Sequence, residues 1–193
     1  MTSLIGRSVL AVIVLTLVFG LGYPLVMTGF AHVAFPNRSN GSLIERDGKV
    51  VGSRLVGQKF TSTRYFHSRP SAVDYNAAGT SFANLGPTSS ELAKSVREAA
   101  QAVLKAEGPY NPGMKIRDIP VDAVTTSGSG IDPHISPAYA RLQAARIAEV
   151  RGLPHERVLE LIDDHTDGRS LGFFGEPGVN VLELNLALDG ERA

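Results

Sequence analysis

Residues 125–134 (TTSGSGIDPH) place serine, aspartate and histidine close together in a glycine-rich stretch. Ser127 or Ser129 could act as a nucleophile. Asp132 and His134 have the chemistry of an orienting carboxylate and a general base. The stretch lacks the G-x-S-x-G elbow that exposes a nucleophilic serine, and short polar side chains in such turns commonly bind their own backbone. We therefore expect an interface or a loop-fixing turn with no catalytic residue, and a serine hydrolase is the alternative.

A second polar pair, His67 and Arg69, lies in a long loop-like stretch, residues 61–87. The pair could bind an anion, or it could anchor the loop to the rest of the domain by hydrogen bonds. A loop of this length inside a compact domain is usually functional or contains short structure. We keep both residues as interface candidates.

Other kinds of chemistry find little support in the sequence. The chain has no cysteine and its five histidines are scattered, so we predict no metal site. It has no G-x-x-x-x-G-K-[ST] phosphate loop, and Gly128-Ser129-Gly130 lacks the third glycine of a dinucleotide fingerprint. Its 19 basic and 19 acidic residues give a formal charge of zero, which argues against a nucleic-acid partner.

The loops that carry these residues lie between segments that predict a mixed α+β domain. A hairpin with an Asp47-Gly48 turn, a capping box at residues 88–91 and a Ser136-Pro137 helix start are the clearest local signals. Strands are expected at residues 42–53 (two arms), 55–60 and 121–124, and helices from 88 to 108, 136 to 151 and 153 to 165. Residues 179–188 fit a strand or a helix, and we prefer a strand because a Gly-Pro-Gly boundary precedes β-branched residues.

An uncharged apolar stretch, residues 8–35, precedes this domain. As a helix it would be roughly 40 Å long, whereas a bilayer core is about 30 Å thick. A buried core helix would show a polar face, and a cleaved signal would have a shorter apolar region. We therefore expect a short tail (1–7), a transmembrane helix (8–35) and one mixed α/β extracytoplasmic domain (36–193).

One face of this helix has features that suggest a protein partner. Gly22 and Gly29 are seven residues apart, so they share a face on which another helix could approach closely. Pro24 removes a backbone donor, and we expect it to kink the helix. These three residues are candidates for an interface within the membrane.

Orientation is argued from charge and from the place of the helix in the chain. Few basic residues precede the span, and several follow it: Arg38, Arg46, Lys49 and Arg54. Positive charge near the span alone would favour an internal domain, but large domains cross membranes largely regardless of charge. Exported domains also commonly begin with an N-terminal apolar segment. We expect a cytoplasmic N terminus and an extracytoplasmic domain.

Several unusual blocks then give the chain a family resemblance. They are GQKF…YFHSRPSA (57–72), YNAAG (75–79), NLGP (84–87), TTSGSGIDPHISP (125–137), RIAEVRGL (146–153) and GEPGVNVLELNLAL (175–188). Together with the single N-terminal span, they resemble the C subunits of Kdp-type potassium-transporting P-type ATPases, the KdpC family, over nearly the whole chain. One departure is Ser81-Phe82-Ala83, where the family usually has Gly-Gly-Ser, and it weakens any phosphate-binding role for that turn.

The resemblance implies an accessory, non-catalytic subunit of a high-affinity potassium uptake complex in the bacterial inner membrane. Its partners would be a potassium-channel-like subunit, a P-type ATPase subunit, a small fourth subunit and membrane lipid. Members of the family are described as catalytic chaperones that raise the affinity of the ATPase subunit for ATP, and are also proposed to sit outside, near the ion inlet. We expect no directly bound cofactor, because ATP and K⁺ are handled by the complex, and a tethered scaffold domain is a further alternative.

Overall fold

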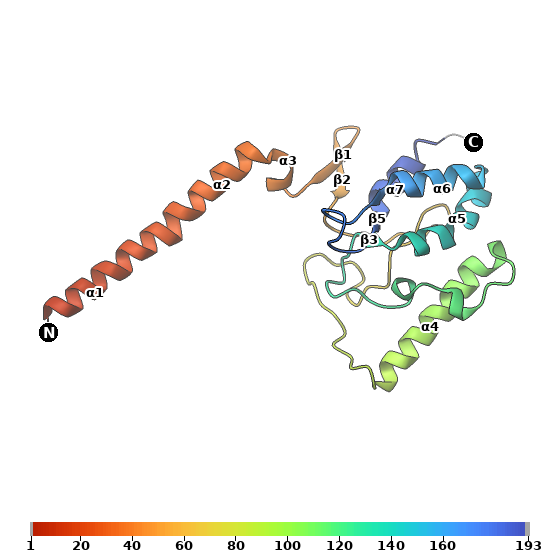
Figure 1. The fold of residues 1–193 in the computed structure, drawn as a ribbon, viewed down its shortest axis with the longest axis horizontal. Coiled ribbons are helices and arrows are strands. Elements are labelled where there is room, and N and C mark those ends of the chain that lie inside the picture. The colour runs from red at the N-terminus through yellow and green to blue at the C-terminus, as the bar shows by residue number, and fades with distance from the viewer. Residues whose placement is uncertain (1, 192–193) are drawn as a thin grey trace. The chain divides into compact units, whose positions relative to one another are not determined.

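The protein folds into helices with two small sheets, and the computed structural model describes residues 2–191 (Figure 1). Two compact units emerge, Met1–Val51 and Gly52–Ala193. The expected α+β class with one long N-terminal apolar helix is confirmed.

The first unit is dominated by one long apolar helix. It comprises α1 (Thr2–Leu15), a π-helical segment η1 (Thr16–Gly22) and α2 (Tyr23–Ala34). The candidate span, Ser3–Ala34, has 32 residues and a mean hydropathy of 2.5, and none of its most apolar window is buried. Residues 2–7, expected as a tail, belong to the helix. The helix is long and apolar enough to cross a membrane.

The kink expected at Pro24 is not seen, since Figure 1 shows α1 and α2 continuing as one rod without a sharp bend. The proline lies in the first turn of α2, directly after the π-helical segment. Tyr23 donates its N–H to the carbonyl of Val18, five residues back. The wider π turn ends where the N–H of Pro24 is missing, so the backbone absorbs the proline without a sharp bend.

A short helix α3 (Pro36–Ser39) leads into the predicted hairpin, β1 (Leu43–Arg46) and β2 (Lys49–Ser53). Asp47 and Gly48 both have positive φ, 53° and 72°, as a type I′ turn requires. The hairpin is therefore confirmed. The strand expected at residues 55–60 is wrong, because only an isolated bridge between Ser53 and Val56 forms there.

The second unit contains a three-stranded antiparallel sheet with the order β3-β5-β4. Its strands are β3 (His134–Ile135), β4 (Thr166–Asp167) and β5 (Gly178–Asn180). Val179 of the central strand is paired with Ile135 on one side and Thr166 on the other. The helices of this unit are α4 (Ser90–Glu107), α5 (Pro137–Arg151), α6 (His155–Asp164) and α7 (Val181–Leu188).

Helix ends follow the local signals closely. Ser136 accepts the N–H of Tyr139 and caps α5, and Gly152 ends that helix with a left-handed φ of 70°. The N-cap of α4 is Ser89, which accepts the N–H of Leu92, so the helix begins one residue later than the Thr88 capping box predicts.

Two strand predictions in this unit are corrected. Residues 181–188, preferred as strand, form helix α7 after the short strand β5, because Asn180 caps a helix there by accepting the N–H of Glu183. The strand expected at residues 121–124 is a 3₁₀ turn, η4 (Val121–Ala123), which follows Pro120. Two further 3₁₀ turns are η2 (Gly108–Tyr110) and η3 (Ile116–Asp118).

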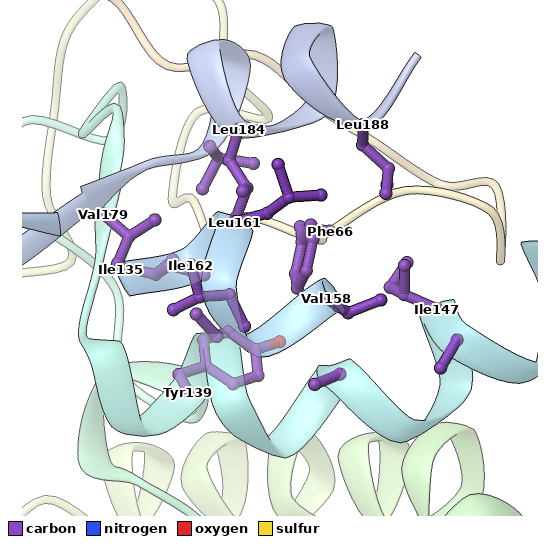
Figure 2. Close-up of a cluster of buried hydrophobic side chains, with 14 of the residues drawn as sticks. Phe66, Ile135, Tyr139, Ile147, Val158, Leu161, Ile162, Val179, Leu184 and Leu188 are labelled. Carbon is purple, nitrogen blue, oxygen red and sulfur yellow. The ribbon is translucent and has the colours of Figure 1, made fainter. Parts of the chain in front are cut away.

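The core lies between α5, α6, α7 and the sheet (Figure 2). Phe66 is fully buried although it belongs to residues 61–87, which contain no helix or strand. Asn185 binds both the N–H and the carbonyl of Phe66, and Gln143 does the same for His67. These two buried amides replace a strand partner and hold the loop in the core.

Candidate functional site

The serine hydroxyls of residues 125–134 bind the backbone of their own turn. Ser127 accepts the N–H of Gly130 at 2.9 Å, and Ser129 accepts the N–H of Ile131 at 3.2 Å. Gly130 has a φ of 73°, and Ser71 donates a hydrogen bond to its carbonyl at 2.6 Å. The turn is thus fixed internally and by a neighbouring loop.

Gly57 shows how closely another segment lies against this turn. Its N–H donates to the carbonyl of Ile131 at 2.7 Å, and a Cβ at this position would collide with the carbonyl of Asp132. Only glycine fits there without displacing the turn. The GQKF block therefore has a structural role next to the polar cluster.

Asp132 connects the other candidate residues. Its Oδ1 accepts the backbone N–H of His134 at 2.9 Å, and its Oδ2 pairs with Nη1 of Arg69 at 3.1 Å. The ring Nδ1 of His134 is 3.8 Å from the Asp132 carboxylate, beyond hydrogen-bond distance. Among the hydrogen bonds of residues 2–191, none joins His134 to Ser127 or Ser129. The geometry resembles a fixed turn more than a nucleophile with its base.

His67 and Arg69 make separate contacts. Arg69 pairs with Asp132, and its Nη2 lies 3.4–3.5 Å from the carbonyls of Thr125 and Thr126. The ring of His67 contacts the carbonyl of Ser62 at 3.0 Å. Burial, assisted by the nearby Arg146 charge, lowers the pKa of His67, and the hydrogen bond to Ser62 opposes that shift. The structure therefore brings Arg69, Asp132 and His134 together, whereas His67 makes its hydrogen bonds with Ser62 and Gln143.

A cleft of about 640 Å³ adjoins Arg69, Asp132 and His134. Its walls carry four carboxylates, those of Asp122, Asp132, Asp167 and Glu176. Asp132 pairs with Arg69, and Asp122 accepts two hydrogen bonds from Ser136. Within residues 2–191, no group of three or more histidine or acidic side chains is arranged to hold a metal ion.

A buried ion pair, which the sequence analysis missed, joins α4 to α5. Arg146 and Glu107 are 1% and 3% exposed, and Nε of Arg146 donates to Oε1 of Glu107 at 2.9 Å. Burial raises the pKa of Glu107, and the Arg146 charge opposes that shift. The position of Arg146 in the helical pattern does not indicate that its side chain is buried, since most arginines in helices face solvent.

An exposed apolar loop was also missed. Leu171, Phe173 and Phe174 are 83%, 65% and 58% exposed, and the two phenylalanine rings lie 4.1 Å apart. Leu171, Gly172 and Gly175 all have positive φ, at 54°, 83° and 80°. This aromatic loop, defined as residues 171–174, exposes three large apolar side chains, and exposed apolar clusters often mark interaction sites.

The membrane candidates Gly22, Pro24 and Gly29 lie on the long helix, and no residue of α2 is buried. No side chain would obstruct a Cβ at Gly29, and at Gly22 the nearest atom is the Leu17 carbonyl at 3.6 Å. Both positions are therefore open to a neighbouring helix.

The family model and the curated relatives that match this chain all point to one family. The family model "KdpC: K+-transporting ATPase, c chain" matches residues 5–190. A "Potassium-transporting ATPase KdpC subunit" of Methylobacterium nodulans is 52% identical over 191 residues, with 92% of each chain covered. Proteins of the same description from Gloeobacter violaceus and Caldanaerobacter subterraneus are each 49% identical, covering 97% and 95% of this chain and 96% and 93% of their own.

Proposed function

Because the chain belongs to the KdpC family of K⁺-transporting ATPase subunits, we propose that it is the accessory subunit that stabilises such a complex without catalysing a reaction itself. It binds the potassium-channel-like subunit, the P-type ATPase subunit and the small fourth subunit. Its N terminus is cytoplasmic, and its domain is extracytoplasmic in the inner membrane. In this proposal, the chain acts by binding its partner subunits.

The observation that carries this proposal is the unburied apolar helix Ser3–Ala34. Such a surface needs lipid or other membrane helices to cover it. The polar residues that could have formed a hydrolytic centre instead fix a turn. The aromatic loop adds a second apolar surface for a partner.

The proposal also states how the chain changes the affinity of the ATPase subunit for ATP. A domain outside the membrane cannot contact cytoplasmic ATP, so it raises the ATP affinity of the ATPase subunit through a coupling free energy between sites. Isothermal titration of the full chain with Mg-ATP should detect no tight binding, whereas the complex should bind ATP more tightly with this chain than without it. Tight Mg-dependent binding by the chain alone would overturn this route.

Co-purification tests the assembly role directly. Replacing Phe173 and Phe174 by serine removes apolar area from the aromatic loop and should lower recovery of the large subunits with the tagged chain. Phe82→Ser, which removes an exposed phenylalanine from another loop, is the matched control and should leave recovery unchanged. Equal recovery with both variants would exclude the aromatic loop as a binding surface. Failure of the unmodified chain to recover any large subunit would reject the assembly role.

A membrane-anchored hydrolase is the second candidate function. Esterase or peptidase turnover by the purified full chain, abolished in Ser129→Ala, would favour it over the accessory role. We expect no turnover, because Ser129 binds the backbone N–H of Ile131 instead of a histidine base.

A further inference from the structure

The backbone hydrogen bonds of the long helix change register near its middle. The π-helical segment η1 ends at Gly22, and the N–H of the next residue, Tyr23, donates to the carbonyl of Val18, five residues back. Pro24 follows in the first turn of α2 and has no N–H to donate. The carbonyl of Phe19 therefore lacks both of its possible helical donors, because the N–H four residues on is bound to Val18 and the residue five on is proline.

No other group of the chain supplies the missing donor. The N–H of Gly22, three residues after Phe19, lies inside the π segment, where each N–H bonds the carbonyl five residues back. Among the side-chain hydrogen bonds of residues 2–191, none ends on the Phe19 carbonyl, and the nearest one in the helix joins the Ser8 hydroxyl to the Leu4 carbonyl. The Phe19 carbonyl is therefore unpaired within the chain.

This carbonyl lies at the depth where an unpaired polar group is most costly. Phe19 is midway along the candidate span Ser3–Ala34, so more than about 20 Å of helix separates it from either end. Half of a hydrocarbon core is only about 15 Å thick. The carbonyl thus stays in hydrocarbon even if the helix tilts, and lipid tails offer it no donor.

The backbone around the carbonyl is open to a neighbouring helix. A Cβ added at Gly20 would meet only the methyl group of Thr16, at 3.7 Å, and one at Gly22 only the carbonyl of Leu17, at 3.6 Å. All residues of η1 are exposed in the chain. Without side chains at these two glycines, another helix can come close enough for a side chain to reach the Phe19 carbonyl.

We propose that the Phe19 carbonyl accepts a hydrogen bond from a hydroxyl or amide side chain on a membrane-spanning helix of another subunit. The donor is a neutral side chain, because a charged one at this depth is costly. This inference rests on the proposed assembly role and adds the chemistry of the partner helix: serine, threonine, asparagine or glutamine facing Gly20 and Gly22. Pro24 keeps the carbonyl free for that donor.

Isotope-edited infrared spectroscopy tests this contact in the full chain. A ¹³C=¹⁸O label at the Phe19 carbonyl, introduced by semisynthesis, separates its amide band from those of the other residues. The band is recorded in lipid bilayers before and after assembly with the other subunits. It should move to lower frequency on assembly, as a carbonyl does when it accepts a hydrogen bond. The same label at Leu10, inside the regular ladder of α1, should not move.

Pro24→Ala restores an N–H to the ladder, so Phe19 is paired inside the helix by residue 24 or by Tyr23. The labelled band should then be low already in the free chain and unchanged by assembly. In bilayers that hold the other subunits, titration with the fluorescent variant should show about three- to tenfold weaker binding, as expected for the loss of one interhelical hydrogen bond. Leu25→Ala, which shortens the next side chain without adding an N–H, should keep the band shift.

Three results would overturn the inference. The Phe19 band could stay unmoved in an assembled complex, or it could be low already in the free, unmodified chain. It could also shift when the density of the chain alone is raised, which would assign the donor to a second copy. An unmoved band in an assembled complex rejects this contact alone, whereas a chain that does not join the other subunits rejects the assembly role and this contact with it.

Discussion

At the scale of a single residue, Arg146 connects three parts of the domain: α4, α5 and the loop before Phe66. Its guanidinium, only 1% exposed, donates to side chains on α4 and α5 and to backbone carbonyls of the loop before Phe66: Glu107, Gln143, Thr63 and Tyr65. Each of these acceptors loses one hydrogen bond if the guanidinium is removed. A buried, fully engaged cation of this kind is costly to delete.

We expect Arg146→Met to lower the free energy of unfolding by about 3–5 kcal/mol, because it leaves the Glu107 carboxylate buried without its counter-charge. Urea unfolding of the full chain in detergent, followed by tyrosine fluorescence, measures this change. The matched control is Arg141→Met on the same helix. Arg141 makes an exposed pair with Asp163, so its loss should cost about 1 kcal/mol or less. Equal losses in the two variants would contradict the structural role of Arg146.

Because the pKa of His67 is lowered in the folded protein, we expect stability to depend on pH. Its native pKa is lowered by burial and by Arg146, so the unfolded chain takes up a proton at a higher pH than the folded chain does. The free energy of unfolding should therefore fall as the pH drops below about 6.5, the usual histidine value, until the native histidine is also protonated.

Urea midpoints measured between about pH 8 and pH 5 test this sign. His67→Gln should flatten the decline, whereas the matched variant His155→Gln, at an exposed position on α6, should retain it. A decline that is equally steep in His67→Gln would assign the effect to other groups.

At the scale of an element, the long N-terminal helix predicts an interface with a partner helix in the membrane. Gly22 and Gly29 are seven residues apart on the long helix, and both are exposed within its own unit. Replacing both by leucine should hinder the close approach of a partner helix and reduce recovery of the assembled complex. Val26→Leu, which enlarges another exposed position on the same helix, is the matched control. A complex of normal stoichiometry with both glycines replaced would show that this face is not an interface.

Elements with local signals could be predicted from the sequence, and those that depend on distant contacts could not. The α5 helix and the hairpin turn follow from Ser136, Gly152 and Asp47-Gly48, whose preferences are local. The α7 helix was missed because its pattern suits both periods, and the cap of Asn180 decides between them. Strands β3 and β4 have two residues each, too few to produce an alternating pattern.

The same distinction applies to the candidate site. The turn around Ser127 and Ser129 was predicted as an interface or a loop-fixing turn, and in the structure both hydroxyls bind the backbone of that turn. The Glu107–Arg146 pair and the amide contacts of Gln143 join residues 39 or more positions apart, and no local pattern indicates them. The aromatic loop was overlooked because two adjacent phenylalanines are as typical of a core as of a surface.

At the scale of the whole molecule, we propose that an uncleaved helix holds the domain on the outer side of the inner membrane. The exposed apolar surface along Ser3–Ala34 is consistent with a membrane anchor, and the side of the membrane is the part of this proposal to be tested. If the domain is outside, its effect on ATP must be transmitted through partner subunits.

Protease accessibility of a C-terminal epitope, combined with N-terminal sequencing of the mature chain, tests this arrangement most directly. The epitope should be cleaved in intact spheroplasts and protected in inverted vesicles, and the mature chain should retain residues 2–34. Protection in spheroplasts with cleavage in inverted vesicles, or a mature chain that begins after residue 34, would contradict the account.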